Sequence, residues 1–380
     1  MRILVVTNDY PPRIGGIQYY VERLVDGLAA AGDEVVVYAS SYDGDREWDA
    51  SRPYTVVRAR TRTLLSTPVV LARVLDLVRT HRSEVVVFGA TMPLALLGPL
   101  VRARTGVPYV ALTHGLEVSA VRMPGGALPL RAVGARAGAV TFVSNWCQDL
   151  LQPAFGDGPR YELLPPAVDP EVFHPGVDGS VVRARHGIEG APLVVCVSRL
   201  VERKGQDRLI AALDAVVERV PDVRLMVVGD GPHRAALEQQ AVEAGHADRV
   251  VFTGPVAESE LAAHYAAGDV FAMPCRERRG GLEVEAFGIV FIQAQAVGRP
   301  VVAGAIGGVP DALVPDRTGV LVDGTDTAAV ADAVAGLLEA PERAARMGAA
   351  GADFVTGGFT WAARTVQLRA LLDRVVADRP

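Results

Sequence analysis

A single lysine stands out in this chain of 380 residues. It is Lys204, the only lysine among 38 Lys and Arg residues, and Arg199 lies five residues before it. The ammonium of lysine is a compact point charge, whereas the guanidinium of arginine is a rigid planar fork, so the two are not interchangeable at a phosphate oxygen. Both residues follow an apolar run that is typical of a buried strand. The pattern predicts a clamp for a diphosphate; the alternative is a solvated surface lysine.

Two glycine pairs follow predicted strands. Gly15 and Gly16 come after the first apolar run, and Gly280 and Gly281 lie in the charged segment 276–293. Glycine lets backbone amides approach a ligand without interference from a Cβ atom, and a helix N-terminus favours an anion. We therefore expect both pairs to contact a sugar or a phosphate. The alternatives are a plain tight turn at the first pair and a solvated loop at the second.

Three further polar side chains are candidates for the same chemistry. His114 ends a predicted strand, where an imidazole would hydrogen-bond a sugar hydroxyl or transfer a proton, with a structural histidine as the alternative. Glu285 and Gln293 are eight residues apart. We predict a helix that begins near Glu285, so both side chains would lie on one helix face and meet one extended ligand.

Two series of Val- and Ile-rich runs predict the strands that position these residues. The runs of the first series are 3–7, 34–39, 84–88, 108–112 and 139–143, and those of the second are 193–198, 224–229, 249–252, 270–273, 300–303 and 320–322. Amphipathic segments alternate with them, which is typical of parallel sheets covered by helices on both faces. We predict an α/β protein with two doubly wound, Rossmann-like domains, residues 1–168 and 169–358, and a final helix over 359–380. Ligands of such sheets bind beyond the carboxyl ends of the strands, so we expect the site in a cleft between the domains.

Composition excludes several classes of protein. Hydrophobic residues make up 50% and charged residues 22% of the chain, as in a globular protein. The N-terminus lacks the pattern of a signal peptide, and glycines and prolines interrupt the longest apolar stretch, 85–101, so we expect a cytoplasmic protein without a membrane span. Cys147, Cys196 and Cys275 lie far apart without a CxxC pair, so we expect neither a disulfide framework nor a zinc site. A net charge of −6 argues against a general nucleic-acid binder.

The motifs together resemble the family 4 retaining glycosyltransferases of GT-B fold over nearly the whole chain. The matching pieces are Gly15–Gly16, His114, Arg199 with Lys204, the turn 228–232, and Glu285 with Gln293. Within that family, the segments 11–18 and 273–285 are most similar to the actinobacterial phosphatidylinositol mannoside mannosyltransferases.

The resemblance implies two Rossmann-like domains that face a central cleft, with the C-terminal helix crossing back to the first. The first domain would bind the acceptor and the second a nucleotide-diphosphosugar. The implied reaction is transfer of a hexose with retention of configuration, most simply mannose from GDP-mannose to a hydroxyl of a phosphatidylinositol mannoside-like acceptor. No cofactor and no metal are implied.

The resemblance also implies roles for individual residues. Arg199 and Lys204 would neutralise the leaving diphosphate, and His114 and Glu285 would contact the donor sugar. The amides implied to contact the sugar and the phosphates belong to Gly280, Gly281, Phe287, Gly288 and Ile289. Gln293 stands where the family has a glutamate that accepts hydrogen bonds from the ribose hydroxyls. An amide keeps one acceptor oxygen and gains two donors.

Three other functions are compatible with parts of this pattern. A UDP-sugar-dependent enzyme with a soluble cyclitol or natural-product acceptor would share the motifs. A nucleotide-sugar binder without activity would explain Gln293. A two-lobed solute-binding protein would share the architecture, but the missing signal segment counts against it.

The acceptor side is predicted from the first loop and from a basic segment. Asp9 and Tyr10 lie in the loop, and the basic segment carries Arg52, Arg58, Arg60, Arg62, Arg73, Arg79 and Arg82 against the single acid Asp76. On a strand, alternate residues share one face, so Arg58, Arg60 and Arg62 would point the same way. We predict that this segment docks the enzyme on the anionic inner face of the plasma membrane, where each basic residue would contribute about 1 kcal/mol. The alternative is a charged edge strand beside a core-packed helix.

Overall fold

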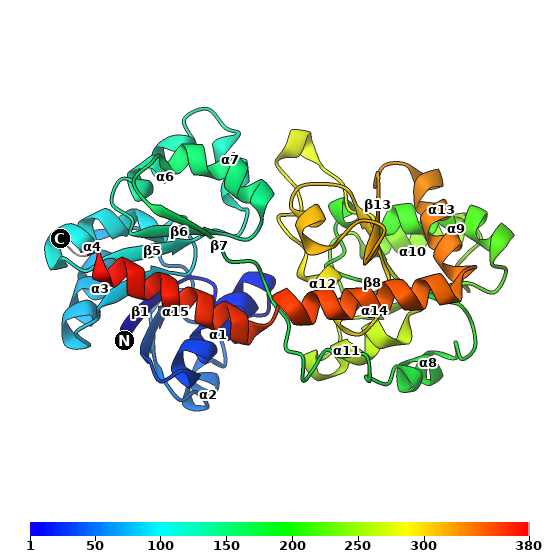
Figure 1. The fold of residues 1–380 in the computed structure, drawn as a ribbon, viewed down its shortest axis with the longest axis horizontal. Helices are drawn as coiled ribbons and strands as arrows, with labels where there is room; N and C mark the ends of the chain where they lie inside the picture. The colour runs from blue at the N-terminus through cyan, green and yellow to red at the C-terminus, as the bar shows by residue number, and fades with distance from the viewer. Residues whose placement is uncertain (379–380) are drawn as a thin grey trace. The chain divides into compact units, whose positions relative to one another are not determined.

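The structure is a computed structural model that describes residues 1–378. It contains two parallel β-sheets. The chain divides into two units, each built on one sheet (Figure 1). The first unit comprises Met1–Pro166 and the segment that begins at Trp361, and the second comprises Ala167–Thr360. The domain boundaries predicted from the sequence, after residue 168 and before residue 359, each lie two residues from the boundaries of these units.

The first unit has a seven-stranded parallel sheet in the order β3-β2-β1-β4-β5-β6-β7. Its strands are β1 (Arg2–Thr7), β2 (Glu34–Ala39), β3 (Thr55–Arg58), β4 (Val85–Phe88), β5 (Tyr109–Leu112), β6 (Ala139–Phe142) and β7 (Arg160–Leu163). Its helices are α1 (Gly16–Ala30), α2 (Asp45–Ala50), α3 (Pro68–Thr80), η1 (Leu94–Leu97), α4 (Gly98–Thr105), α5 (Glu117–Val121), α6 (Ala127–Gly134), α7 (Asn145–Phe155) and α15 (Trp361–Ala377).

The second unit has a six-stranded parallel sheet in the order β10-β9-β8-β11-β12-β13. Its strands are β8 (Leu193–Val197), β9 (Arg224–Val228), β10 (Val250–Gly254), β11 (Val270–Met273), β12 (Val301–Gly304) and β13 (Gly319–Val322). Its helices are α8 (Ser180–His186), η2 (Glu202–Lys204), α9 (Gln206–Arg219), α10 (Arg234–Glu243), α11 (Glu258–Ala267), η3 (Arg279–Gly281), α12 (Ile289–Ala296), η4 (Val309–Ala312), α13 (Thr327–Leu338) and α14 (Pro341–Gly358).

The middle strands of both sheets form the cores. Every residue of β4, β5, β8 and β11 is buried. A strand covered by helices on both faces has no side in water, so its residues are apolar throughout. The predicted double winding of both domains is therefore confirmed.

The C-terminal helix α15 packs against α1 in the first unit, and Figure 1 shows it in red beside α1. The contact is close, because a Cβ atom at Gly27 would lie 2.0 Å from Oγ1 of Thr365. Trp361 adds an edge-to-face contact with Tyr20. The last helix therefore completes the hydrophobic core of the N-terminal unit.

Strand order reverses at one point in each sheet, and ligands of doubly wound sheets bind at such points. The reversal lies between β1 and β4 in the first unit and between β8 and β11 in the second. The loops that leave these strands at their carboxyl ends are 8–15 and 89–93 in the first unit and 198–205 and 274–288 in the second. These loops contain most of the predicted site residues.

Candidate active site

A cluster of three charged side chains occupies the reversal point of the second sheet. Lys204 Nζ lies 2.6 Å from Oε2 of Glu285, and Nη1 of Arg203 lies 2.7 Å from the same oxygen. The Lys204 side chain is only 10% exposed and that of Glu285 12%. Lys204 and Glu285 were predicted as site residues, whereas Arg203 was not. The cluster joins the loop after β8 to the loop after β11.

The charges of this cluster stabilise one another. Burial alone would raise the pKa of Glu285, but the charges and hydrogen bonds of Lys204 and Arg203 outweigh it and lower the pKa below its ordinary value. Glu285 is therefore a carboxylate at neutral pH. Within residues 1–378 its second oxygen, Oε1, accepts no hydrogen bond. That oxygen is available to a hydroxyl of a ligand.

Further contacts hold the two loops together. The backbone N–H of Arg276 donates to the carbonyl of Arg203 at 2.9 Å. The guanidinium of Arg276 forms a bidentate pair with Asp207 at the start of α9. Gly205 has a φ of 82°, and a Cβ atom there would lie 2.1 Å from the carbonyl oxygen of Pro274. Only glycine fits this position, so the close approach of the two loops depends on it.

Arg199 takes no part in the ion pairs of this cluster. Its side chain is exposed and forms no ion pair within the described residues. Its carbonyl accepts a hydrogen bond of 3.2 Å from Nε2 of Gln206. The structure thus places Arg203, rather than Arg199, beside Lys204 and Glu285. The adjacent pair of basic residues, Arg203-Lys204, was the sequence signal that would have revealed it.

The predicted helix near Glu285 begins later than expected. Gly288 adopts a left-handed conformation with a φ of 89°, and α12 starts at Ile289. Glu285 therefore lies in the loop, and the prediction that it shares a helix face with Gln293 is wrong. The ring of Phe287 is buried and contacts Phe359.

Gln293 lies in the second turn of α12 and is 7% exposed. The hydroxyl of Tyr265 donates to its Oε1 at 2.9 Å. An amide oxygen can only accept, so this bond leaves the Nε2 donors for a ligand. Within the described chain, no hydrogen bond of Nε2 is formed.

The second glycine pair lies away from a long helix. Gly280 and Gly281 belong to the short turn η3, which ends well before α12. Paired backbone hydrogen bonds between Arg278 and Glu283 close this turn. The helix that was predicted to begin near Glu285, just after this pair, starts at Ile289, so Gly288 and not the pair precedes its N-terminus.

His114 follows β5 in the first unit and is neutral. Nε2 of its ring donates to the carbonyl of Gly89 at 2.6 Å, since a carbonyl can only accept. Burial lowers the pKa of His114 to about 4, although the hydrogen bond to Gly89 opposes this shift. At neutral pH the remaining ring nitrogen, Nδ1, is therefore an acceptor. Proton donation by an imidazolium is excluded there, whereas a hydrogen bond from a hydroxyl is allowed.

The first glycine pair lies at the start of α1, as predicted. Gly16 is the first residue of the helix, and a Cβ atom at Gly15 would lie 2.2 Å from Oε1 of Gln18. Gln18 in turn donates to Oδ1 of Asp9 at 2.8 Å. Burial raises the pKa of Asp9, and the charge of Arg13 opposes it. Asp9 is thus a half-buried side chain that Gln18 holds beside the N-terminus of α1.

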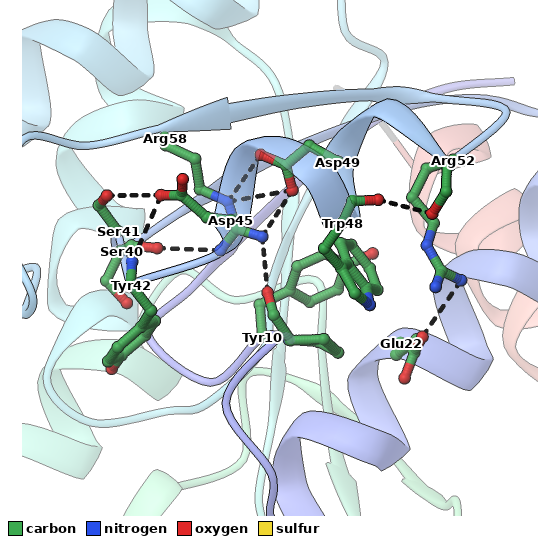
Figure 2. A network of polar contacts seen from close by, with 12 residues as sticks. Tyr10, Glu22, Ser40, Ser41, Tyr42, Asp45, Trp48, Asp49, Arg52 and Arg58 are labelled. Atoms are coloured by element: carbon green, nitrogen blue, oxygen red, sulfur yellow. Dashed lines mark hydrogen bonds and ion pairs between the residues drawn. The ribbon is translucent and has the colours of Figure 1, made fainter.

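Two acceptor-side candidates hold the fold instead (Figure 2). Tyr10 is fully buried, and its hydroxyl lies 2.8 Å from that of Tyr54. Arg58 is 10% exposed, forms an ion pair with Asp49 and donates to the carbonyl of Pro11 at 2.6 Å. These contacts fasten α2 and the first loop to the sheet. Neither side chain is free to bind an acceptor or a membrane.

Four of the seven arginines of the basic segment form ion pairs, so its free charge is lower than the local count indicates. β3 ends at Arg58, so Arg60 and Arg62 are not on a strand, and the shared face is wrong. The ion pairs are Arg52 with Glu22, Arg58 with Asp49, Arg62 with Asp43, and Arg73 with Asp76. Most of these acids lie outside the segment 52–82, where a local count misses them. Arg60, Arg79 and Arg82 are exposed and form no ion pair within the described residues.

Among residues 1–378, no helix is long and apolar enough to cross a membrane. No group of three His, Cys, Asp or Glu side chains in this part of the chain is arranged to hold a metal ion. The three cysteines in this part of the chain are buried and form no disulfide.

Comparisons with known proteins agree with this architecture. The model of glycosyl transferases group 1 matches residues 180–354, and that of Glycosyltransferase Family 4 matches residues 14–172. A GDP-mannose-dependent alpha-(1-6)-phosphatidylinositol monomannoside mannosyltransferase of Mycolicibacterium smegmatis is 46% identical over 374 residues, which are 97% of this chain and 98% of the relative. A GDP-mannose-dependent monoacylated alpha-(1-6)-phosphatidylinositol monomannoside mannosyltransferase of Corynebacterium glutamicum is 38% identical, over 95% of this chain and 94% of the relative. Sucrose-phosphate synthase from Thermosynechococcus elongatus matches the fold with a TM-score of 0.83 at 24% identity, over 99% of both chains.

Proposed function

From the premise that this chain belongs to the family 4 glycosyltransferases of GT-B fold, we propose that it transfers mannose from GDP-mannose to a hydroxyl of a phosphatidylinositol mannoside. The chain is a glycosyltransferase. Its choice of donor and acceptor is supported by relatives of matching length whose names state this reaction. The alignment with the Mycolicibacterium smegmatis relative covers 97% of this chain and 98% of the relative, so the proposal concerns the whole reaction.

The charge cluster of Lys204, Arg203 and Glu285 carries the mechanistic part of the proposal. In the reaction, the bond between the anomeric carbon and the diphosphate breaks, and a bond to the acceptor oxygen forms. Negative charge develops on the leaving GDP. A fixed cation at the reversal point of the sheet stabilises that charge without reorganisation during the reaction. Lys204 supplies this cation, with Arg199 as a second phosphate ligand, and the step needs no metal.

We propose that two hydrogen-bond acceptors orient the donor sugar, the anionic Glu285 and the neutral His114. Oε1 of Glu285 accepts from one sugar hydroxyl, and Nδ1 of His114 accepts from another. The amides around Gly288 and Ile289 bind the phosphates at the start of α12. We propose retention of configuration by attack on the face from which the diphosphate leaves, with a donor phosphate oxygen taking the proton of the acceptor hydroxyl.

The proposed reaction is tested by mass spectrometry of products made by the purified enzyme. GDP-mannose, UDP-mannose and UDP-glucose are each offered with phosphatidylinositol monomannoside in vesicles and, separately, with inositol phosphate in solution. We expect one hexose to be added to the lipid from GDP-mannose, and to the soluble cyclitol only at a far lower rate. Transfer from a UDP-sugar to the soluble acceptor in preference to the lipid would refute the proposal.

A further inference from the structure

One carboxylate oxygen of Glu285 is shared by two cations. Lys204 Nζ and Arg203 Nη1 lie 2.6 and 2.7 Å from Oε2. Lys204 and Glu285 alone would form a neutral pair, in which the lysine charge is largely cancelled at short range. With Arg203 the cluster has a net charge of +1. Cys275 is the other titratable group that interacts with Glu285, and it adds no charge, because burial raises the pKa of its thiol to about 12.

The hydrogen bonds of the cluster also leave Lys204 able to bind an anion. An ammonium has three N–H donors, and Lys204 uses one of them on Glu285. No other hydrogen bond of Nζ is formed within residues 1–378. Two donors and the excess charge therefore remain for an anion. Arg203 keeps Oε2 occupied, so that Glu285 does not draw on the remaining donors of Lys204.

We propose that Arg203 is a positioning residue of the donor site, which compensates Glu285 and so leaves the charge of Lys204 to the diphosphate. This inference rests on the proposed function, since it takes a nucleotide diphosphate as the ligand. It adds a third cation to the two that were expected from the sequence. Arg203 acts through Glu285 and Lys204, and no direct contact with the donor is required of it.

The backbone position of Arg203 does not depend on its side chain. Its carbonyl accepts from the amide of Arg276, and Arg276 is anchored by a bidentate pair with Asp207. The Arg203 side chain is 29% exposed, so removal of its guanidinium leaves no large cavity. A variant at this position therefore changes the charge of the cluster and leaves the loop in place.

The test measures binding of inorganic pyrophosphate and of GDP by calorimetry at low ionic strength. The variants are Arg203→Met, which removes the charge at similar length, Arg203→Gln as a second neutral variant, and Arg203→Lys, which restores the charge. Arg185→Met is the matched control, since Arg185 pairs with Glu260 at 2.6 Å on helices that carry none of the cluster. Thermal melting verifies that each variant is folded.

We expect both neutral variants to bind pyrophosphate and GDP about tenfold more weakly, the effect of one charged hydrogen-bonding group. Arg203→Lys should recover most of this loss, and Arg185→Met should bind as the wild type does. In the transferase assay, the acid limb of kcat/KM should move to higher pH in Arg203→Met, because loss of a neighbouring cation raises the pKa of Glu285. A structural role alone would not shift that limb.

Two results would overturn the inference. One is unchanged pyrophosphate affinity in whichever neutral variant is folded, and the other is an Arg203→Lys variant as weak as the neutral ones. Failure of the proposed function gives a different result. In that case the wild type would not transfer mannose from GDP-mannose, while pyrophosphate binding would still respond to the charge at position 203.

Discussion

Replacing Lys204 with alanine should remove most of the stabilisation of the leaving diphosphate. The Lys204 side chain is 10% exposed, and within the described chain its ammonium is hydrogen-bonded only to Glu285. Two unit charges about 4 Å apart interact by about 4 kcal/mol at an effective dielectric constant of about 20. Glu285 cancels part of this energy and Arg203 restores part of it. Loss of one preorganised group of this kind costs about 2.7–4 kcal/mol, so we expect kcat to fall by about 10² to 10³-fold.

The assay is steady-state turnover of GDP-mannose at neutral pH. The fall should lie mainly in kcat, because the charge is needed most as the diphosphate leaves. Lys204→Arg should also be impaired, since a planar fork in this buried position cannot replace a point charge without moving Glu285 or the loop at Gly205. Arg185→Met serves again as the control for loss of an exposed ion pair.

Stability separates a catalytic loss from a folding defect. In Lys204→Ala, Arg203 still pairs with Glu285, so the buried carboxylate keeps a partner and the melting temperature should change little. Turnover within about threefold of the wild type, in a folded variant, would refute the assignment of Lys204; that limit is far below the loss of one charge-stabilising group.

Three further predictions concern other parts of the molecule. Gln293→Glu should tighten GDP binding by about 1–2 kcal/mol in calorimetry, because Tyr265 would donate to one carboxylate oxygen and the other would accept from the ribose; unchanged or weaker binding would show that this contact is not made. The pKa of His114 is about 4 in the folded protein and about 6.5 in the unfolded chain, so protonation favours the unfolded chain as the pH falls below about 6.5. Between pH 7 and 5 the melting temperature of the wild type should therefore fall further than that of His114→Gln. Equal falls in the two proteins would contradict this. Arg60→Gln and Arg79→Gln should each weaken sedimentation with anionic vesicles at low salt by about 1 kcal/mol, whereas Arg58→Gln should lower the melting temperature, and a wild type that does not bind such vesicles would rule out membrane docking through this segment.

The central strands of both sheets could be predicted because each is apolar on both faces. The edge strands of the second sheet, β10 and β13, were also predicted, from the runs 249–252 and 320–322, but those of the first sheet were missing from the predicted runs. β3 and β7 lie at the two ends of the first sheet, and their residues are only partly buried. Half-exposed strands carry polar residues such as Arg58 and Glu162, so they have no continuous apolar run. Pairing with a neighbouring strand creates them, and the local sequence does not reveal that pairing.

The types of residue in the candidate site could be predicted from the sequence, but their arrangement in space could be predicted only in part. Lys204 and Glu285 are 81 positions apart, and the order of the strands, which brings their loops together, is a property of the whole sheet. The contact of Arg203 with Glu285 depends on the same packing. The start of α12 depends on Gly288 and on the bond from the amide of Gly308 to the carbonyl of Glu285, at 3.0 Å. Such long-range contacts fix the loop, and the spacing of Glu285 and Gln293 alone does not show them.

The most direct test of the diphosphate site is a crystal structure of the enzyme with GDP. We predict that a diphosphate oxygen lies within hydrogen-bond distance of Lys204 Nζ, while Arg203 remains on Oε2 of Glu285. A nucleotide whose diphosphate binds elsewhere, with the bond between Lys204 and Glu285 unchanged and no phosphate beside it, would contradict the account.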